Sequence, residues 1–230
     1  MAIGRKMPDL DKNRGPRNRR ALAEGTERET GRLEAFSDGI FAFAITLLIV
    51  DVRLPPSEGN GHLLRSLLAL WPSYFALVFS FVMIGIYWSQ HHYVFKLYRN
   101  TDHLFNLLHL LFLLSISVLP FPTRVFADYI ESEPDRATGI AFYTLGLLFP
   151  AATWFATWIY AMWGRRIVDP KLNPKFVRRL TVQYGGSVAL YLMAFLLTVA
   201  VNVWAGLVLA VGLTLLYLLP PPRPRYDRPP

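Results

Sequence analysis

Polar and titratable side chains with a possible functional role lie at one end of each of three apolar segments. The first segment opens with an opposite-charge pair and a serine, the second ends in paired histidines, and the third carries a histidine near its start. A charge within an apolar span is costly to bury and needs a partner. We therefore expect a single polar cluster formed by Arg32, Ser37, Asp38, His91, His92 and His109.

Two functions fit such a cluster. Histidine titrates near neutral pH and could form a proton-sensitive gate, whereas hydrogen bonds among the same side chains would clamp three helices together. Asp38 points about 140° away from Phe43 at 100° per residue, towards neighbouring helices, which favours the clamp. A metal site at His91, His92 and Asp102 is disfavoured, because adjacent histidines lie about 100° apart on a helix.

Catalytic motifs are missing from the sequence. It contains no Gly-rich phosphate loop, no His-Glu-x-x-His motif and no Gly-x-Ser-x-Gly elbow. It also contains no cysteine, which excludes disulfides and thiolate metal sites. We expect no enzyme activity, no cofactor and no tightly bound metal.

The elements that must position the polar side chains are apolar segments. Hydrophobic residues make up 53% of the 230 residues and charged residues only 17%. A helix needs about 20 mostly apolar residues to cross a bilayer. The sequence therefore predicts an all-α polytopic integral membrane protein with six transmembrane helices. Their approximate ranges are 36–54, 67–95, 104–126, 138–163, 180–201 and 203–219.

Two boundaries between these segments have a specific signal. Asn202 separates the last two segments and predicts a tight helical hairpin. Pro120 and Pro122 fall near the end of the third segment, where proline stops or bends a helix.

The basic residues predict the topology. The net charge of +8 would suggest nucleic acid in a soluble chain, but here the charges fall between the apolar segments. With the N-terminus inside, 20 of the 24 Lys and Arg residues are cytoplasmic, and only Arg53, Arg65, Arg124 and Arg136 lie outside. This asymmetry predicts a multi-pass protein of the inner membrane with both termini in the cytoplasm, a lipid bilayer as partner and no nucleic acid.

Three regions follow from composition. Residues 1–31 hold eight Lys or Arg among Pro, Gly and Asn and are expected to form a disordered basic arm. Residues 32–219 form the six-span domain, and residues 220–230 a Pro/Arg-rich cytoplasmic tail.

The first apolar segment has one nearly continuous apolar stripe. It comprises Phe36, Gly39, Phe43, Thr46 with Leu47, Val50 and Leu54. From periodicity alone, ordinary helix packing or lipid contact explains the stripe. No internal repeat accompanies it, so a pathway built on this helix would need several chains.

Several short motifs give the sequence a family resemblance. They are Arg32-x-x-x-Phe36-Ser37-Asp38-Gly39, then Phe41-Ala-Phe-Ala-Ile-Thr-Leu-Leu48, then Trp88-x-x-His91-His92, then Asp102, and then Leu119-Pro-Phe-Pro-Thr123. In this order they cover roughly residues 32–125, and the chain resembles bacterial members of the transmembrane protein 175 family, relatives of the endolysosomal potassium channel.

The resemblance implies a homotetramer of six-span subunits whose first helix lines a central pore. It implies a potassium-preferring cation conductance, with potassium as the permeant ion and no carbonyl-lined filter. The implied constriction consists of Phe43, Leu47 and Val50, with Thr46 as a polar ring. Two residues depart from the family pattern: Phe43 replaces an Ile or Leu, and His109 replaces a more usual Asn.

Two other functions remain open. A proton-coupled secondary transporter would use Asp38 and the histidines as its relay. A non-conducting membrane scaffold would use the same cluster for structure alone.

Overall fold

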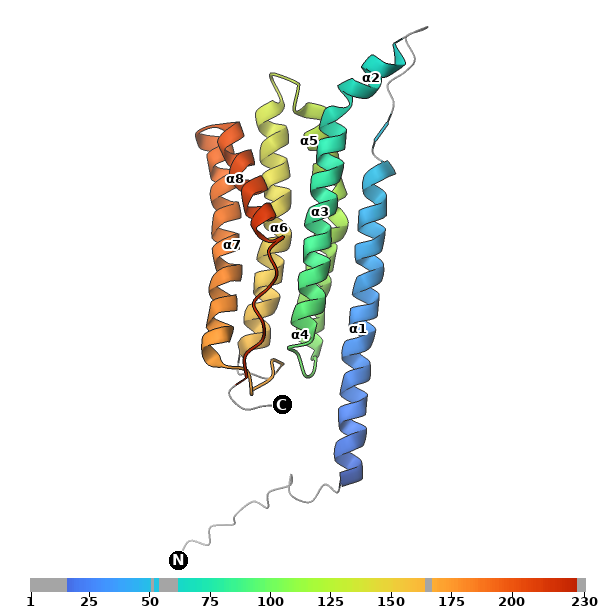
Figure 1. The fold of residues 1–230 in the computed structure, drawn as a ribbon, viewed down its shortest axis with the longest axis vertical. Coiled ribbons are helices and arrows are strands. Elements are labelled where there is room, and N and C mark those ends of the chain that lie inside the picture. The colour runs from blue at the N-terminus through green and yellow to red at the C-terminus, as the bar shows by residue number, and fades with distance from the viewer. Residues whose placement is uncertain (1–15, 51, 54–61, 164–166, 227–230) are drawn as a thin grey trace, which may run out of the picture.

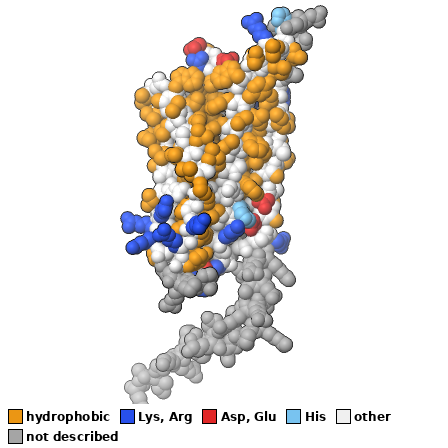
Figure 2. Space-filling view, in the orientation of Figure 1, with side chains coloured by type: hydrophobic (Ala, Val, Ile, Leu, Met, Phe, Trp, Pro, Cys, Tyr) orange, Lys and Arg blue, Asp and Glu red, His pale blue; other side chains and the backbone are white. Residues whose placement is uncertain are grey.

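The computed structural model describes residues 16–50, 52–53, 62–163 and 167–226, with the backbone alone for 16–29. Within these ranges it is an elongated bundle whose long helices have roughly parallel axes, with the short α2 lying obliquely at one end (Figure 1). Apolar side chains cover the middle of the face in Figure 2, and Lys and Arg gather near the end where α7 begins. We call this the basic end of the bundle. The apolar surface matches a protein surrounded by lipid.

Helix α1 spans Pro16–Val50 and runs along one side of the bundle (Figure 1). Its apolar part is Thr30–Val50, which packs against α3 and α4. The helix thus begins well before residue 31, where the sequence placed the end of a disordered arm. The segment from Arg19 to Leu33 is rich in Ala, Glu, Arg and Leu, which are strong helix formers. Residues 1–15 of that arm lie outside the described residues.

The third predicted span consists of two helices, and the second begins at the end of one short helix and continues in a long one. Helix α2 (Leu63–Ala69) stops one residue before α3 (Trp71–Phe95), which has Pro72 in its first turn. Helix α4 (His103–Val118) passes at Leu119 into α5 (Pro120–Tyr129). Proline suits the first turn of a helix because its missing N–H has no partner there. The expected interruption of the helix is therefore confirmed just before Pro120, and a second helix, α5, continues beyond it.

Helices α6 (Arg136–Met162) and α7 (Pro174–Ala200) are the remaining long spans. α6 packs against α4, α5, α7 and α8. The hairpin at Asn202 is confirmed: its side chain accepts hydrogen bonds from the backbone N–H of Trp204 (2.9 Å) and Ala205 (3.1 Å) at the start of α8 (Val203–Leu216). A Cβ at Gly206 would collide with Ala194 and Thr198 of α7, so glycine permits the close approach of these two helices.

The last predicted span differs from a full transmembrane helix. Five helical segments in the described chain are long and apolar enough to cross a membrane, and α8 is a shorter apolar helix of 14 residues. At 1.5 Å per residue it covers about 21 Å, less than the roughly 30 Å of the hydrocarbon core. The chain then descends in extended form along the bundle to the basic end (Figure 1). Pro220, Pro221 and Pro222 end the helical pattern here, because proline cannot donate the backbone bonds that a helix needs.

Candidate functional site

A buried polar triad ties the start of the apolar part of α1 to α3 and α4. Ser37 Oγ lies 2.9 Å from His109 Nε2, and His109 Nε2 lies 3.2 Å from His91 Nε2. All three side chains are buried. Aromatic rings surround the imidazoles, and Phe95 stacks on His91 with 4.1 Å between ring centroids. The triad is thus a polar contact among three helices inside an aromatic shell.

The number of N–H and O–H donors limits the hydrogen bonds that this triad can form. The Ser37 hydroxyl donates to the Leu33 carbonyl oxygen at 2.7 Å, so its oxygen accepts the hydrogen of His109 Nε2. The same nitrogen faces His91 Nε2, and one hydrogen must serve both neighbours. His91 Nδ1 is buried without a hydrogen-bond partner in the described structure. The shared hydrogen and the unpaired His91 Nδ1 together leave the triad short of full hydrogen bonding.

The other expected cluster members have separate partners nearer the surface. The Trp88 indole donates to Asp38 Oδ1 at 2.9 Å. His92 Nδ1 lies 2.7 Å from Glu34 Oε1. Arg32 is exposed and forms no ion pair within the described part of the chain.

The single six-residue cluster expected from the sequence is therefore divided into a buried triad and an outer pair of contacts. Adjacent His91 and His92 point to different partners because successive helix residues differ by about 100°. Trp88 and Glu34 were missed as partners. Their spacing could have identified them, because Trp88 lies one turn before His92 and Glu34 one turn before Asp38.

Asp102 has a structural role in the geometry of α4. Its side chain accepts from the Phe105 backbone N–H at 2.8 Å as an N-cap, and it accepts from the Tyr160 hydroxyl at 2.9 Å. Among the described residues, no three His, Asp or Glu side chains are grouped to hold a metal ion.

The opposite face of α1 is uncovered by its own chain. Phe36 is 53% exposed, Phe43 63% and Val50 61%. Thr46 is exposed as well, and its hydroxyl donates to the Phe43 carbonyl at 2.9 Å. The residues that turn inward to the bundle are Ser37, Phe41, Ala44 and Leu48.

The uncovered face is wider than the stripe drawn from the sequence. Ile49 belongs to it and is 57% exposed, whereas Leu47 is half-buried at its edge. Its centre lies near Thr46, about 60° around the helix from Phe43. The small residues Gly39 and Ala42 also lie on it. Lining of a pore by Phe43, Thr46, Leu47 and Val50 stays a prediction.

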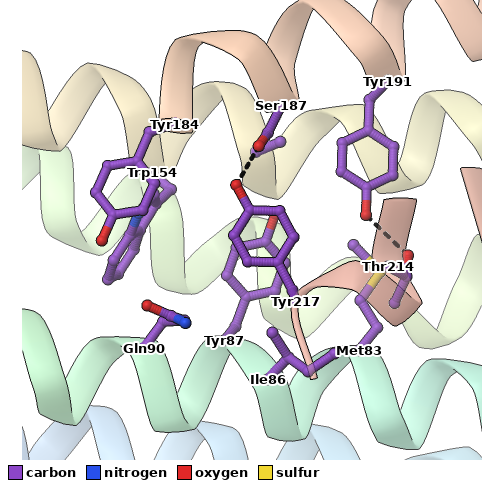
Figure 3. A pocket seen from close by; sticks show the side chains of 11 residues that line it. Met83, Ile86, Tyr87, Gln90, Trp154, Tyr184, Ser187, Tyr191, Thr214 and Tyr217 are labelled. Carbon is purple, nitrogen blue, oxygen red and sulfur yellow. Dashed lines mark hydrogen bonds between the residues drawn. The ribbon is translucent and has the colours of Figure 1, made fainter. Parts of the chain in front are cut away.

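A narrow cavity lies between α3, α6, α7 and α8 (Figure 3). Tyrosine hydroxyls point into it, with Tyr191 bonded to Thr214 at 2.8 Å and Tyr217 to Ser187. Its volume is about 40 Å³, which suits a few water molecules and is too small for an organic ligand. It therefore offers no competing substrate site.

Comparison with known proteins gives consistent matches. The family described as "Endosomal/lysosomal potassium channel TMEM175" matches residues 32–120. A Streptomyces collinus protein named a potassium channel is 38% identical over 82% of this chain and 91% of its own length. A second potassium channel, from Chamaesiphon minutus, is 36% identical over 86% of this chain and 98% of its own length.

A solved structure agrees with the fold. The crystal structure of a lysosomal potassium-selective channel TMEM175 homolog from Chamaesiphon minutus superposes with a TM-score of 0.75 at 36% identity. The superposition covers 84% of this chain and 97% of the other.

Proposed function

Because this chain belongs to the family of the endosomal/lysosomal potassium channel TMEM175, we propose that it is a potassium-preferring cation channel with passive conduction. Four copies surround one central pore, and α1 of each copy lines it. The observation that carries this proposal is the division of α1 into two faces. One face is anchored to its own bundle through Ser37, and the other is apolar and uncovered.

The proposed pore is closed and opened by apolar side chains. Phe43, Leu47 and Val50 from four copies form a constriction, with Thr46 as a polar ring. An apolar ring narrower than a hydrated ion dewets and blocks conduction, and a small widening admits ions. Selectivity in such a pore arises from partial dehydration of the ion and is modest.

The polar triad acts as a clamp in this proposal. It fixes the rotation of α1 about its axis, because Ser37 lies about 120° around the helix from Phe43. The outer contacts of Asp38 with Trp88 and of His92 with Glu34 support the same orientation. Conduction through such a pore requires no cofactor and no enzymatic step.

The proposed membrane placement follows from charge. The basic end faces the cytoplasm, where Lys and Arg are favoured near transmembrane segments. Both termini then lie on that side of the inner membrane.

Ion flux through liposomes tests this function. The full chain is reconstituted, and potassium and sodium flux are measured without any coupled solute. We expect passive flux with a preference for potassium, and Phe43→Ala raises the flux or lowers the preference because it widens the constriction. Phe149→Ala, an exposed phenylalanine on α6, is the matched control and leaves both unchanged. Absence of passive potassium flux, or equal responses of the two variants, contradicts the proposal.

A further inference from the structure

A basic cavity lies at the basic end, between the start of α7 and the C-terminal segment. Its volume is about 680 Å³. Seven of the described residues line it, of which four are cationic and none is acidic. They are Lys175, Arg179, Arg223 and Arg225, with Asn173, Phe176 and Pro222.

The C-terminal segment is held in place against the bundle. The Tyr93 hydroxyl of α3 donates to the Pro222 carbonyl oxygen at 2.6 Å. The Asn173 backbone N–H donates to the Arg225 carbonyl oxygen at 2.9 Å, and Leu172 pairs with Tyr226 in a β-bridge. These contacts bring Arg223 and Arg225 to the cavity that Lys175 and Arg179 line, and the last two share one helix face.

The described structure shows no acidic counterpart for the four cations. Within the described chain, none of them has a carboxylate oxygen within 4 Å, although Arg99 at the same end pairs with Asp169 at 2.9 Å. Like charges held together repel one another, so an anion that binds between them is stabilised. Arginine matches the oxygens of a phosphate with two parallel hydrogen bonds. The chemistry of the cavity is therefore that of a phosphate site.

An apolar groove begins one turn deeper on the same helix. It lies between α7 and α8 and has a volume of about 310 Å³. Its apolar rim includes Val182, 65% exposed, and Leu216, 62% exposed. Val182 lies about 4.5 Å further along α7 than Arg179, and Leu190 at the far end of the groove about 16 Å further. An acyl chain that descends from a phosphate at Arg179 would lie in this groove.

We propose that the cavity and the groove together bind one anionic glycerophospholipid. Its phosphate lies among the four cations, and one acyl chain lies along the α7–α8 groove. The bound lipid joins the C-terminal segment to α7 by charge. A free phosphate compound would use the cavity but has no part that fills the groove, and for this reason the lipid is the better occupant.

The charge part of the proposal is tested by lipid binding rather than by ion flux. The purified full chain in detergent is titrated with phosphatidylglycerol or phosphatidylcholine and examined by native mass spectrometry. Arg179→Gln with Arg223→Gln weakens phosphatidylglycerol binding at least about tenfold. The control pair Arg178→Gln with Arg65→Gln removes the same charge outside the cavity and leaves binding unchanged. Equal loss in both pairs shows a net-charge effect and overturns the proposal.

The groove is tested with a variant that fills it. A Cβ at Gly186 has no atom within 4 Å, so Gly186→Phe adds a ring in the groove without a clash of its first atom. We expect weaker phosphatidylglycerol binding, while Gly212→Phe, at an equally open glycine of α8, binds as the parent does. Unchanged lipid binding in Gly186→Phe, or competition by free glycerol phosphate at the concentration of the lipid, overturns the lipid as occupant.

Discussion

Ser37 is the residue that joins the α1 backbone to the histidine pair. It donates to Leu33 within its own helix and accepts from His109 of α4. Its small side chain lets the imidazole approach α1 closely. The contact is buried, so its loss leaves His109 Nε2 with one hydrogen-bond partner fewer and no water to replace it. This lowers the free energy of unfolding more than the loss of an exposed contact would.

Ser37→Ala should therefore lower stability measurably. We expect a loss of about 1–2 kcal/mol in the free energy of unfolding, because His109 Nε2 keeps only its contact with His91. The measurement is the thermal unfolding midpoint of the detergent-solubilised protein. Ser117→Ala is the matched control, because the Ser117 hydroxyl donates only to Leu113 of its own helix. A midpoint shift no larger than that of the control would refute the role of Ser37.

Residue types at segment ends predicted which side chains would meet, but not how they would pair. Ser37, His91 and His109 were expected together and lie together. Asp38 and His92 lie nearer the surface than these three residues. Which side chains pair with each other depends on the rotation and tilt of the helices. These quantities come from packing of large side chains such as Phe41 and Phe112, which a hydropathy pattern does not specify.

The helix boundaries that the sequence predicted correctly are set by single residues at those boundaries. Pro120 and Asn202 act through their own backbone and side chain, and their effects were foreseeable. The last predicted span continued to residue 219, whereas α8 ends at Leu216, because residues 203–219 are mostly apolar and give no signal for an earlier stop. A hydropathy pattern indicates whether a segment is apolar enough to lie in the membrane. It does not distinguish a helix from an extended segment. Three consecutive prolines lack N–H donors, so an extended backbone there leaves fewer donors unsatisfied.

A side-chain hydrogen bond from α3 helps to hold the extended C-terminal segment against the bundle. Tyr93→Phe removes the hydroxyl that donates to Pro222, and we expect the segment to detach more often. The Arg225–Tyr226 bond then becomes more accessible, and trypsin cleaves it several-fold faster. Intact-mass spectrometry over a time course measures this cleavage. Tyr74→Phe, an exposed tyrosine of α3, serves as control, and equal rates for both variants would rule out the contact as a restraint.

At the scale of the whole molecule, one chain leaves the apolar face of α1 without a partner. Lipid could cover this face, but the small residues Gly39 and Ala42 on it also permit close approach of another helix. In the proposed tetramer, neighbouring copies meet there and the pore forms between them.

Gly39→Leu tests whether another copy contacts this face. A Cβ at Gly39 has no atom of its own chain within 4 Å, so the larger side chain should not disturb the subunit. We expect a reduced tetramer fraction in native mass spectrometry together with altered potassium flux. Gly31→Leu, also open within its own chain, should leave the assembly intact. A full tetramer with parental flux in Gly39→Leu would mean that no neighbouring helix lies close to this residue.

Cysteine accessibility tests most directly whether α1 lines the pore, because the chain contains no cysteine of its own. Thr46→Cys places a single thiol at the centre of the uncovered α1 face, and a charged methanethiosulfonate reagent is applied during potassium flux in liposomes. If α1 lines the pore, the reagent reaches the thiol through water and flux falls by most of its value, whereas Val208→Cys, 70% exposed on α8, is unaffected. If Thr46→Cys conducts and its flux does not respond to the reagent, the face of α1 meets lipid or packed helices, and the pore lies elsewhere.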